Sequence, residues 1–203
     1  MPRHFSESEK KEIKNKLLDA AKTLFLQFGI NKTNIVDITD KAGVGKGTFY
    51  TFFKSKGDIY MQLYSEEWTL VHHVLDEKYK FRKGDISELL LDYIFENRGL
   101  LLNHPLLSVV YDRQTLTLIS EASVAKRLAE FRELSDQKMV EMIESWYEAN
   151  HIQSSVKPEI VSGMMRSLSY LNYHKDEIGE GIFDDVIQHL ASGITLVVNQ
   201  KRE

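Results

Sequence analysis

The 203-residue chain contains no cysteine and only three prolines. The lack of cysteine excludes disulfide bonds and thiol chemistry and suits a reducing compartment. The scarcity of proline leaves long segments in which nothing interrupts a helix. No apolar run approaches the ~20 residues that a membrane-spanning helix needs, and the first residues lack the apolar segment of a secretory signal. We therefore expect a cytoplasmic protein with no membrane association.

Motifs of catalysis are also missing. The sequence has no Gly-x-Ser-x-Gly, no His-Glu-x-x-His and no phosphate-binding loop. The run from Gly43 to Thr48 lacks the spacing of such a loop and the strand that precedes one. His72 and His73 diverge by ~100° around a helix and cannot share a metal ion with good geometry. We expect no enzymatic activity, no cofactor and no metal.

Charge is distributed unevenly along the chain. Residues 1–60 contain eleven Lys or Arg and seven Asp or Glu, a net charge of +4, whereas residues 61–203 contain fifteen and twenty-three, a net charge of −8. A basic N-terminal part suits a polyanion such as a nucleic acid. A solvated charged face explains the same counts, so charge alone leaves both interpretations open.

Helical periodicity dominates the sequence. The first helix is expected after a capping box of Ser6 and Glu9 and should end at Gly29. Its apolar stripe is Ile13, Leu17, Ala20, Ala21, Leu24, Phe25 and Phe28.

Three short elements, two helices and the turn between them, are expected between Gly29 and Gly57. Asn34 and Asp37 suit the first turn of a helix, and Gly43 suits a turn with positive φ. The buried residues of the two short helices are expected to be Ile35, Ile38 and Ala42 in the first and Phe49 and Phe53 in the second. A long helix is expected from about Asp58 to Phe81.

Further helices are expected over 86–103, 105–113, 115–149, 158–174 and 184–200. Almost no β-branched residues alternate at period two, so no strand is expected. The predicted fold class is all-α, with an N-terminal three-helix domain over residues 1–57, a connecting fourth helix over 58–81 and a larger helical domain over 58–203.

Two short helices joined by a glycine-containing turn define a helix-turn-helix, whose second helix enters the major groove of DNA. An ordinary corner in a helix bundle is the alternative. The segment carries Lys46, Tyr50, Lys54 and Lys56 with no acidic residue between Asp40 and Asp58, and a solvated corner would mix the two signs. The pattern favours the DNA-binding interpretation.

This segment resembles the DNA-binding domain of the tetracycline-repressor (TetR) family over roughly residues 10–65. The matching motifs are Ala42-Gly43-Val44, Lys46-Gly47-Thr48-Phe49-Tyr50 and Phe53-Lys54-Ser55-Lys56, with Ala20-Ala21, Leu24-Phe25, Phe28-Gly29, Thr33 and Asp37-Ile38 before them. Beyond this segment, only length and helix content agree with the family.

The resemblance implies contacts to a double-stranded, palindromic DNA operator. It places Lys46, Gly47, Tyr50 and Thr51 at base edges and Asn34, Thr48 and Lys56 at phosphates. Gly45 replaces a common Ser or Thr, and Phe52 replaces a usual His or Tyr. We expect weaker phosphate anchoring as a result, for which the basic N-terminal segment with Arg3, Lys10, Lys11 and Lys14 compensates.

The resemblance also assigns the last two helices to a homodimer interface, and a palindromic operator requires a two-fold dimer. Part of each apolar stripe must instead pack within its own domain. The candidate interface residues are Met164, Leu168, Leu171, Val186, Leu190, Ile194 and Val197.

A small-molecule effector is a further implication, because the second domain is rich in aromatic and methionine side chains that suit an adaptable apolar pocket. Most of these side chains are expected in the core, and for the polar candidates a surface position is favoured over a role in ligand binding. The candidate pocket residues are His104, Tyr111, Arg113, Gln114, Met139, Trp146, Met165 and Tyr170.

The sequence thus predicts a dimeric transcriptional repressor that a small apolar or amphipathic effector releases from its operator. The effector would move the two recognition helices off the ~34 Å spacing of successive major grooves. The alternative is a DNA-binding activator or architectural protein of the same fold with no effector.

Overall fold

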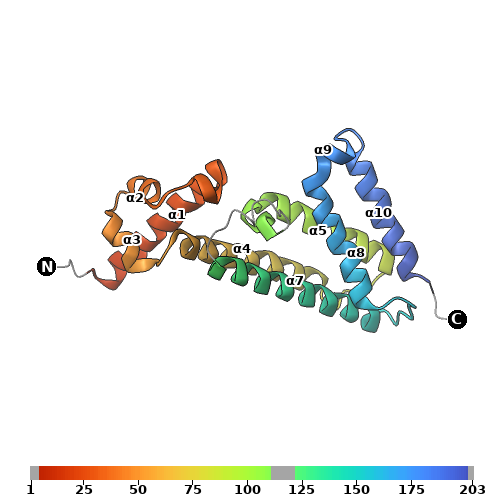
Figure 1. Cartoon of the computed structure of the whole chain (residues 1–203). Helices are drawn as coiled ribbons and strands as arrows, with labels where there is room; N and C mark the ends of the chain where they lie inside the picture. The colour runs from red at the N-terminus through yellow and green to blue at the C-terminus, as the bar shows by residue number, and fades with distance from the viewer. Residues whose placement is uncertain (1–4, 111–121, 201–203) are drawn as a thin grey trace.

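The computed structural model describes residues 5–110 and 122–200, and these residues form helices and no strand. The all-α prediction is confirmed. Figure 1 shows an elongated molecule with a small N-terminal group of helices at one end and a larger group at the other.

The N-terminal group consists of α1 (Glu7–Lys32), α2 (Ile35–Ala42) and α3 (Lys46–Phe52). The predicted capping box is present: the Glu9 N–H donates to Ser6 Oγ at 3.3 Å and the Ser6 N–H donates to Glu9 Oε2 at 2.8 Å. Gly29 leaves the helical conformation with φ 78°, as expected of a stop. The shared core contains Leu17, Ala21, Phe25, Ile38, Phe49 and Phe53, all nearly inaccessible to solvent.

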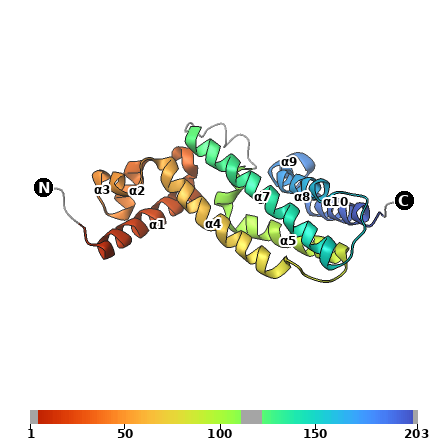
Figure 2. The ribbon, with the colours of Figure 1, turned by 90° about the horizontal axis from the view of Figure 1, so that it is seen from below.

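The long helix α4 (Lys56–Tyr79) leaves this group and enters the larger one. It lies beside α7 (Ala122–Ala149), and the two run in the same direction (Figure 2). Matched contacts along their lengths show this direction: Arg127 pairs with Asp58, Trp68 Nε1 donates to Ser135 Oγ at 2.7 Å, and Trp146 Nε1 donates to the Tyr79 carbonyl at 2.8 Å.

Helix α5 (Ile86–Asn103) begins at an Asp85 cap and returns along the molecule. The short η1 (Pro105–Val110) follows it. Tyr79, Tyr93 and Trp146 pack edge to face where α4, α5 and α7 meet, with ring centroids 5.3–6.4 Å apart. This aromatic cluster fixes the three helices against one another.

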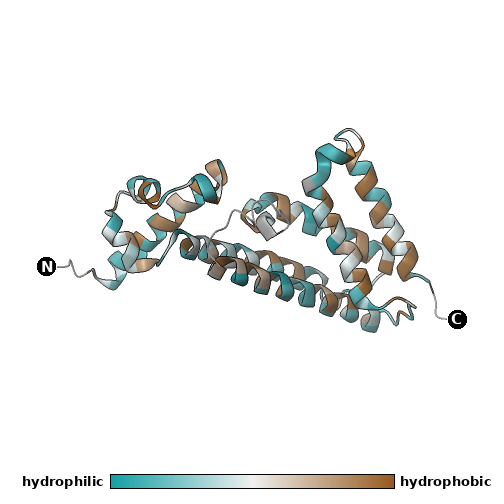
Figure 3. Ribbon diagram, in the orientation of Figure 1, coloured by the Kyte–Doolittle hydropathy of each residue, from teal (hydrophilic) through white to brown (hydrophobic). Residues whose placement is uncertain are grey.

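The chain ends with α8 (Pro158–Leu171), η2 (Asn172–His174), α9 (Lys175–Ile178) and α10 (Phe183–Val198). Helices α8 and α10 pack against each other, and α10 also packs on α5. Figure 3 shows hydrophobic residues along both α8 and α10, at the end of the molecule away from the N-terminus.

Several helix ends differ from the expected positions. Helix α4 begins at Lys56 because the Ser55 hydroxyl accepts the Asp58 N–H at 3.1 Å, and it ends before Phe81, which has φ 60°. The expected helix over 105–113 is a 3₁₀ helix over Pro105–Val110, and the rest of it lies outside the described residues. The start of the expected 115–149 helix also lies outside the described residues, since these omit 111–121. The expected helix over 158–174 changes to 3₁₀ geometry after Leu171.

Candidate DNA-binding surface and ligand cavity

Helices α2 and α3 meet at a tight turn of Gly43, Val44 and Gly45. Gly43 has φ 67° and ψ 33°, a left-handed conformation that favours glycine, and the Val44 N–H donates to the Thr39 carbonyl at 3.0 Å. Val44 packs against the core beneath the turn. This short connection fixes the angle between the two helices and thus presents α3 at the surface.

Helix α3 has one buried and one exposed face. Phe49 is fully buried and contacts the Phe53 ring at a centroid distance of 5.7 Å. The four residues predicted to face bases, Lys46, Gly47, Tyr50 and Thr51, are all exposed, and Tyr50 is 52% accessible. The exposed face therefore combines a cation with hydrogen-bonding groups, a composition that suits base edges and phosphates.

The three predicted phosphate contacts lie in different settings. Asn34 is exposed at the N-cap of α2, where its N–H donates to Asp37 Oδ2 at 2.9 Å. Thr48 is half-buried in α3. The Lys56 ammonium donates to the Thr33 carbonyl at 2.9 Å and to the Asn31 carbonyl at 3.4 Å. Lys56 thus ties the start of α4 to the end of α1.

An ion cluster joins the N-terminal helices to the larger domain. Glu67 of α4 is 7% exposed, and Lys22 of α1 lies 2.8 Å from its Oε1. His104, which follows α5, lies 3.6 Å from Oε2, an atom that makes no hydrogen bond. These contacts connect α1, α4 and the end of α5 at one point.

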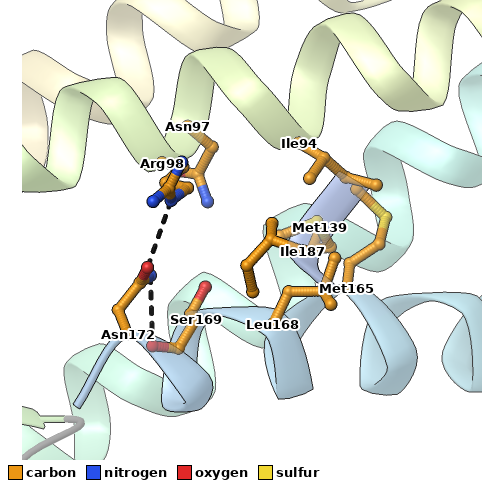
Figure 4. A pocket seen from close by; sticks show the side chains of 9 residues that line it. All are labelled: Ile94, Asn97, Arg98, Met139, Met165, Leu168, Ser169, Asn172 and Ile187. Carbon is orange, nitrogen blue, oxygen red and sulfur yellow. Dashed lines mark hydrogen bonds between the residues drawn. The ribbon is translucent and has the colours of Figure 1, made fainter. Parts of the chain in front are cut away.

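A cavity lies between α5, α7, α8 and α10 in the larger domain (Figure 4). Its apolar wall is formed by Ile94, Met139, Met165, Leu168 and Ile187, and its polar end by Asn97, Arg98, Ser169 and Asn172. The cavity encloses about 10 Å³, which is room for about one water molecule.

Hydrogen bonding at the polar end of this cavity is incomplete. Arg98 donates from Nε to Asn172 Oδ1 at 3.1 Å and from Nη2 to Asp184 Oδ1 at 2.6 Å. Among the described residues, no group accepts from Arg98 Nη1, and the side chains of Asn97 and Ser169 have no hydrogen-bond partner. Convergent polar groups at the end of an apolar cavity are characteristic of small-molecule sites.

A second cavity of about 40 Å³ adjoins the first, and Asn97 and Met139 line both. Its wall includes Trp68 and His72, whose Nε2 lies 3.1 Å from Ser135 Oγ. Burial lowers the pKa of His72 to about 4; the positive charge of Lys138 adds to this effect and the negative charge of Asp76 opposes it. His72 is therefore uncharged at neutral pH.

The predicted pocket residues divide among several places. Met139 and Met165 line the first cavity. Trp146 is fully buried in the aromatic cluster and fills the core, and His104 faces Glu67 in an open groove beside α1. Tyr170 is half-buried in α8. The remaining three candidates, Tyr111, Arg113 and Gln114, lie outside the described residues.

Sequence reasoning missed Asn97 and Arg98. The composition of this stretch gives no signal for them, because Asp92 and Glu96 are polar as well, but the spacing gives one for Asn97. At helical spacing, Asn97 falls three residues after the buried Ile94, which predicts that it faces the interior.

The predicted dimer residues form two groups. Leu168 and Ile194 are 7% and 3% exposed and belong to the core of their own chain. Leu190 is 46% exposed, and the remaining residues of the set are half-buried: Met164, Leu171, Val186 and Val197. Ile160 and Leu196, at 57% and 71%, add exposed apolar surface on the same two helices.

The part of the chain that the structure describes lacks two further features. None of the helices there is long and apolar enough to cross a membrane. No group of three or more His, Asp or Glu side chains in residues 5–110 and 122–200 is placed to hold a metal ion.

The fold and the exposed α3 define a helix-turn-helix protein. Residues 17–63 match the family described as bacterial regulatory proteins, tetR family. The chain is therefore similar to this family in its N-terminal domain.

Individual relatives agree with this assignment. The chain is 34% identical over 88 residues to the HTH-type transcriptional regulator AcrR of Shigella flexneri, which covers 43% of this chain and 34% of AcrR. The matched region spans less than half the length of each curated relative.

Two solved structures show the same fold over nearly the whole chain. A protein from Syntrophomonas wolfei assigned to the TetR family aligns with TM-score 0.70 and 20% identity, covering 94% of this chain and 96% of that one. The regulator FadR from Bacillus subtilis, in complex with stearoyl-CoA, aligns with TM-score 0.65 and 20% identity, covering 88% and 98%.

Proposed function

We propose that the protein is a dimeric transcriptional repressor that leaves its operator when a small amphipathic molecule enters the larger domain. The observation that carries the proposal is the two-sided α3, which buries Phe49 and exposes Lys46 and Tyr50. Helix α3 has only seven residues and exposes a lysine at its start and an aromatic ring one turn later. An ordinary corner of a helix bundle does not require this exposed pair, whereas reading of the major groove uses both a cation and an apolar ring.

The cavity in the larger domain supports the effector part of the proposal. It combines an apolar wall with convergent polar groups. Helix α4 carries Trp68 and His72 at the second cavity and begins at the helix-turn-helix. A ligand that moves α4 therefore changes the position of α3, provided that it binds one of the two positions more tightly.

A dimer through α8 and α10 completes the proposal. Exposed apolar residues on both helices offer a self-complementary surface, as a two-fold interface requires. Two copies of α3 then reach successive major grooves of a palindromic site.

The test is fluorescence-anisotropy binding to the DNA that flanks the protein's own gene, compared with a scrambled duplex at several salt concentrations. We expect at least ~10³-fold tighter binding to the specific site. Equal binding to both duplexes that collapses with salt would indicate counterion release alone and would favour the architectural alternative.

Variants assign the base-reading role. Lys46→Ala should weaken operator binding by ~10-fold or more, because a lysine contact to a base edge is worth about 1–3 kcal/mol. Lys83→Ala is the matched control: Lys83 is exposed in the turn after α4, at the end of that helix away from the helix-turn-helix, so the same charge is lost far from DNA. An operator affinity that Lys46→Ala leaves unchanged would refute the assignment.

A further inference from the structure

We infer that the effector is an amphipathic carboxylate whose anionic head binds at Arg98 and whose apolar chain lies along Met139 and Met165. This inference rests on the proposed function, because it assigns a chemical class to the effector of the same cavity. Its basis is the charge, the unused hydrogen-bond donors and the apolar lining of the first cavity.

The charge at the polar end is positive. Arg98 is the charged residue among those that line the first cavity, and its side chain is 24% exposed. Its partner Asp184 is 73% exposed, so water screens this ion pair and it contributes little. An anion at Arg98 can therefore replace or join Asp184 at low cost.

The available donors fit a carboxylate. Arg98 Nη1 makes no hydrogen bond to a described residue, and neither does the Asn97 amide or the Ser169 hydroxyl. These groups converge on one end of the cavity (Figure 4). A guanidinium binds a carboxylate through paired N–H donors, and such charge-assisted bonds are about twice as strong as neutral ones.

The apolar part of the ligand has a path away from this head site. Ile94, Met165, Leu168 and Ile187 line the first cavity, and Met139 lines both this cavity and the second, whose wall includes aromatic side chains. The two cavities are small as they stand, so a hydrocarbon chain must displace side chains. Methionine suits this role because its unbranched chain has three rotatable bonds.

The experiment compares three ligands that share a ten-carbon chain and differ in the head group: decanoate, decanol and decylamine. Binding to the full-length protein is measured by isothermal titration calorimetry at pH 7.5 below the micelle concentration. We expect decanoate to bind at least ~10-fold more tightly than decanol and decylamine to bind more weakly than either.

Two variants separate a ligand-binding role of Arg98 from a structural one. Arg98→Gln should remove the preference for decanoate and change decanol binding less than ~2-fold. Asp184→Asn breaks the ion pair and keeps the guanidinium, so decanoate should bind at least as tightly as to the wild type. If Arg98 acted only as a link to Asp184, both variants would weaken decanoate binding alike.

Three results would overturn the inference: decanol or decylamine binding as tightly as decanoate, a preference for decanoate that survives Arg98→Gln, or no binding of decanoate. The operator assay distinguishes these results from failure of the proposed function. If the protein selects its operator and an uncharged ligand releases it, the proposed function holds and the inference about the effector is wrong. If the protein selects no operator, the proposed function is wrong.

Discussion

His72 lies in the interior of the larger domain between the Trp68 ring, 4.2 Å away by centroids, and Ser135. Because burial holds its pKa at about 4 in the folded protein, compared with 6.5 when exposed, the unfolded chain binds the His72 proton first as pH falls. Stability is therefore fully present above pH 6.5, is lost between pH 6.5 and 4, and changes no further from this group below pH 4.

The change His72→Gln should remove this acid sensitivity. Between pH 8 and pH 5 the wild type should lose about 2 kcal/mol of unfolding free energy through His72, a loss that the variant lacks. Urea unfolding at both pH values measures it. His73→Gln is the control, since His73 is the neighbouring residue with a side chain 63% exposed; it should keep the wild-type pH dependence. Equal pH dependence in the wild type and His72→Gln would contradict the prediction.

At the same scale, single residues explain which parts of the cavity could be predicted from sequence. Met139 and Met165 were accessible to prediction because flexible apolar side chains are common in ligand pockets. That His104 lies beside Glu67 and outside the first cavity could not be predicted from its position in the chain, because Glu67 is 37 positions earlier and Lys22 earlier still. Contacts of that separation depend on how helices pack, which no local pattern encodes.

Among the structural elements, the turn between α2 and α3 sets the presentation of the recognition helix. Gly43→Ala should destabilise the protein by about 1 kcal/mol, because a side chain in the left-handed region clashes with its own backbone. Gly47→Ala is the matched control: Gly47 lies inside α3 without a positive φ, and an added Cβ at either glycine meets nothing within 4 Å. Thermal unfolding of both variants measures the difference. If the control variant is destabilised as much as Gly43→Ala, the left-handed backbone conformation of Gly43 is not the cause of the loss of stability.

Helix boundaries show what periodicity predicts and what it does not. The caps at Ser6, Asn34 and Gly43 follow from short local motifs and were predicted. Helix α4 begins at Lys56 and not at the predicted Asp58. The local sequence Ser55-Lys56-Gly57-Asp58 contains a signal for this start, because Ser55 is a capping residue and Asp58 lies three residues later. Just beyond the end of α4, the side chain of Asn150, which follows α7, forms hydrogen bonds with the backbone of Arg82 and Gly84. No pattern within α4 predicts this contact.

For the whole molecule, the fold class followed from helical periodicity, but the arrangement of helices did not. The parallel course of α4 and α7 rests on contacts such as Trp68 with Ser135 and Asp76 with Lys138. It makes α4 the element that touches the second cavity, the ion cluster at Glu67 and the helix-turn-helix. In the proposed mechanism, a movement of α4 connects a ligand in the larger domain to the helix-turn-helix.

The proposed dimer gives the last prediction at this scale. Leu190→Glu should convert the protein from a dimer to a monomer at micromolar concentration, because an unpaired carboxylate in an apolar interface costs several kcal/mol. Leu134→Glu is a close control, since Leu134 and Leu190 are both 46% exposed and only the second lies on α10. Sedimentation velocity measures the mass of each variant.

The interface lies elsewhere if the dimer survives Leu190→Glu or if Leu134→Glu also dissociates it. A monomeric wild type would show that the mechanism involves no dimer. A monomeric Leu190→Glu protein should also bind a palindromic operator far more weakly than the wild type, because the two recognition helices come from two chains. It should still bind decanoate, because the proposed ligand cavity lies within one chain.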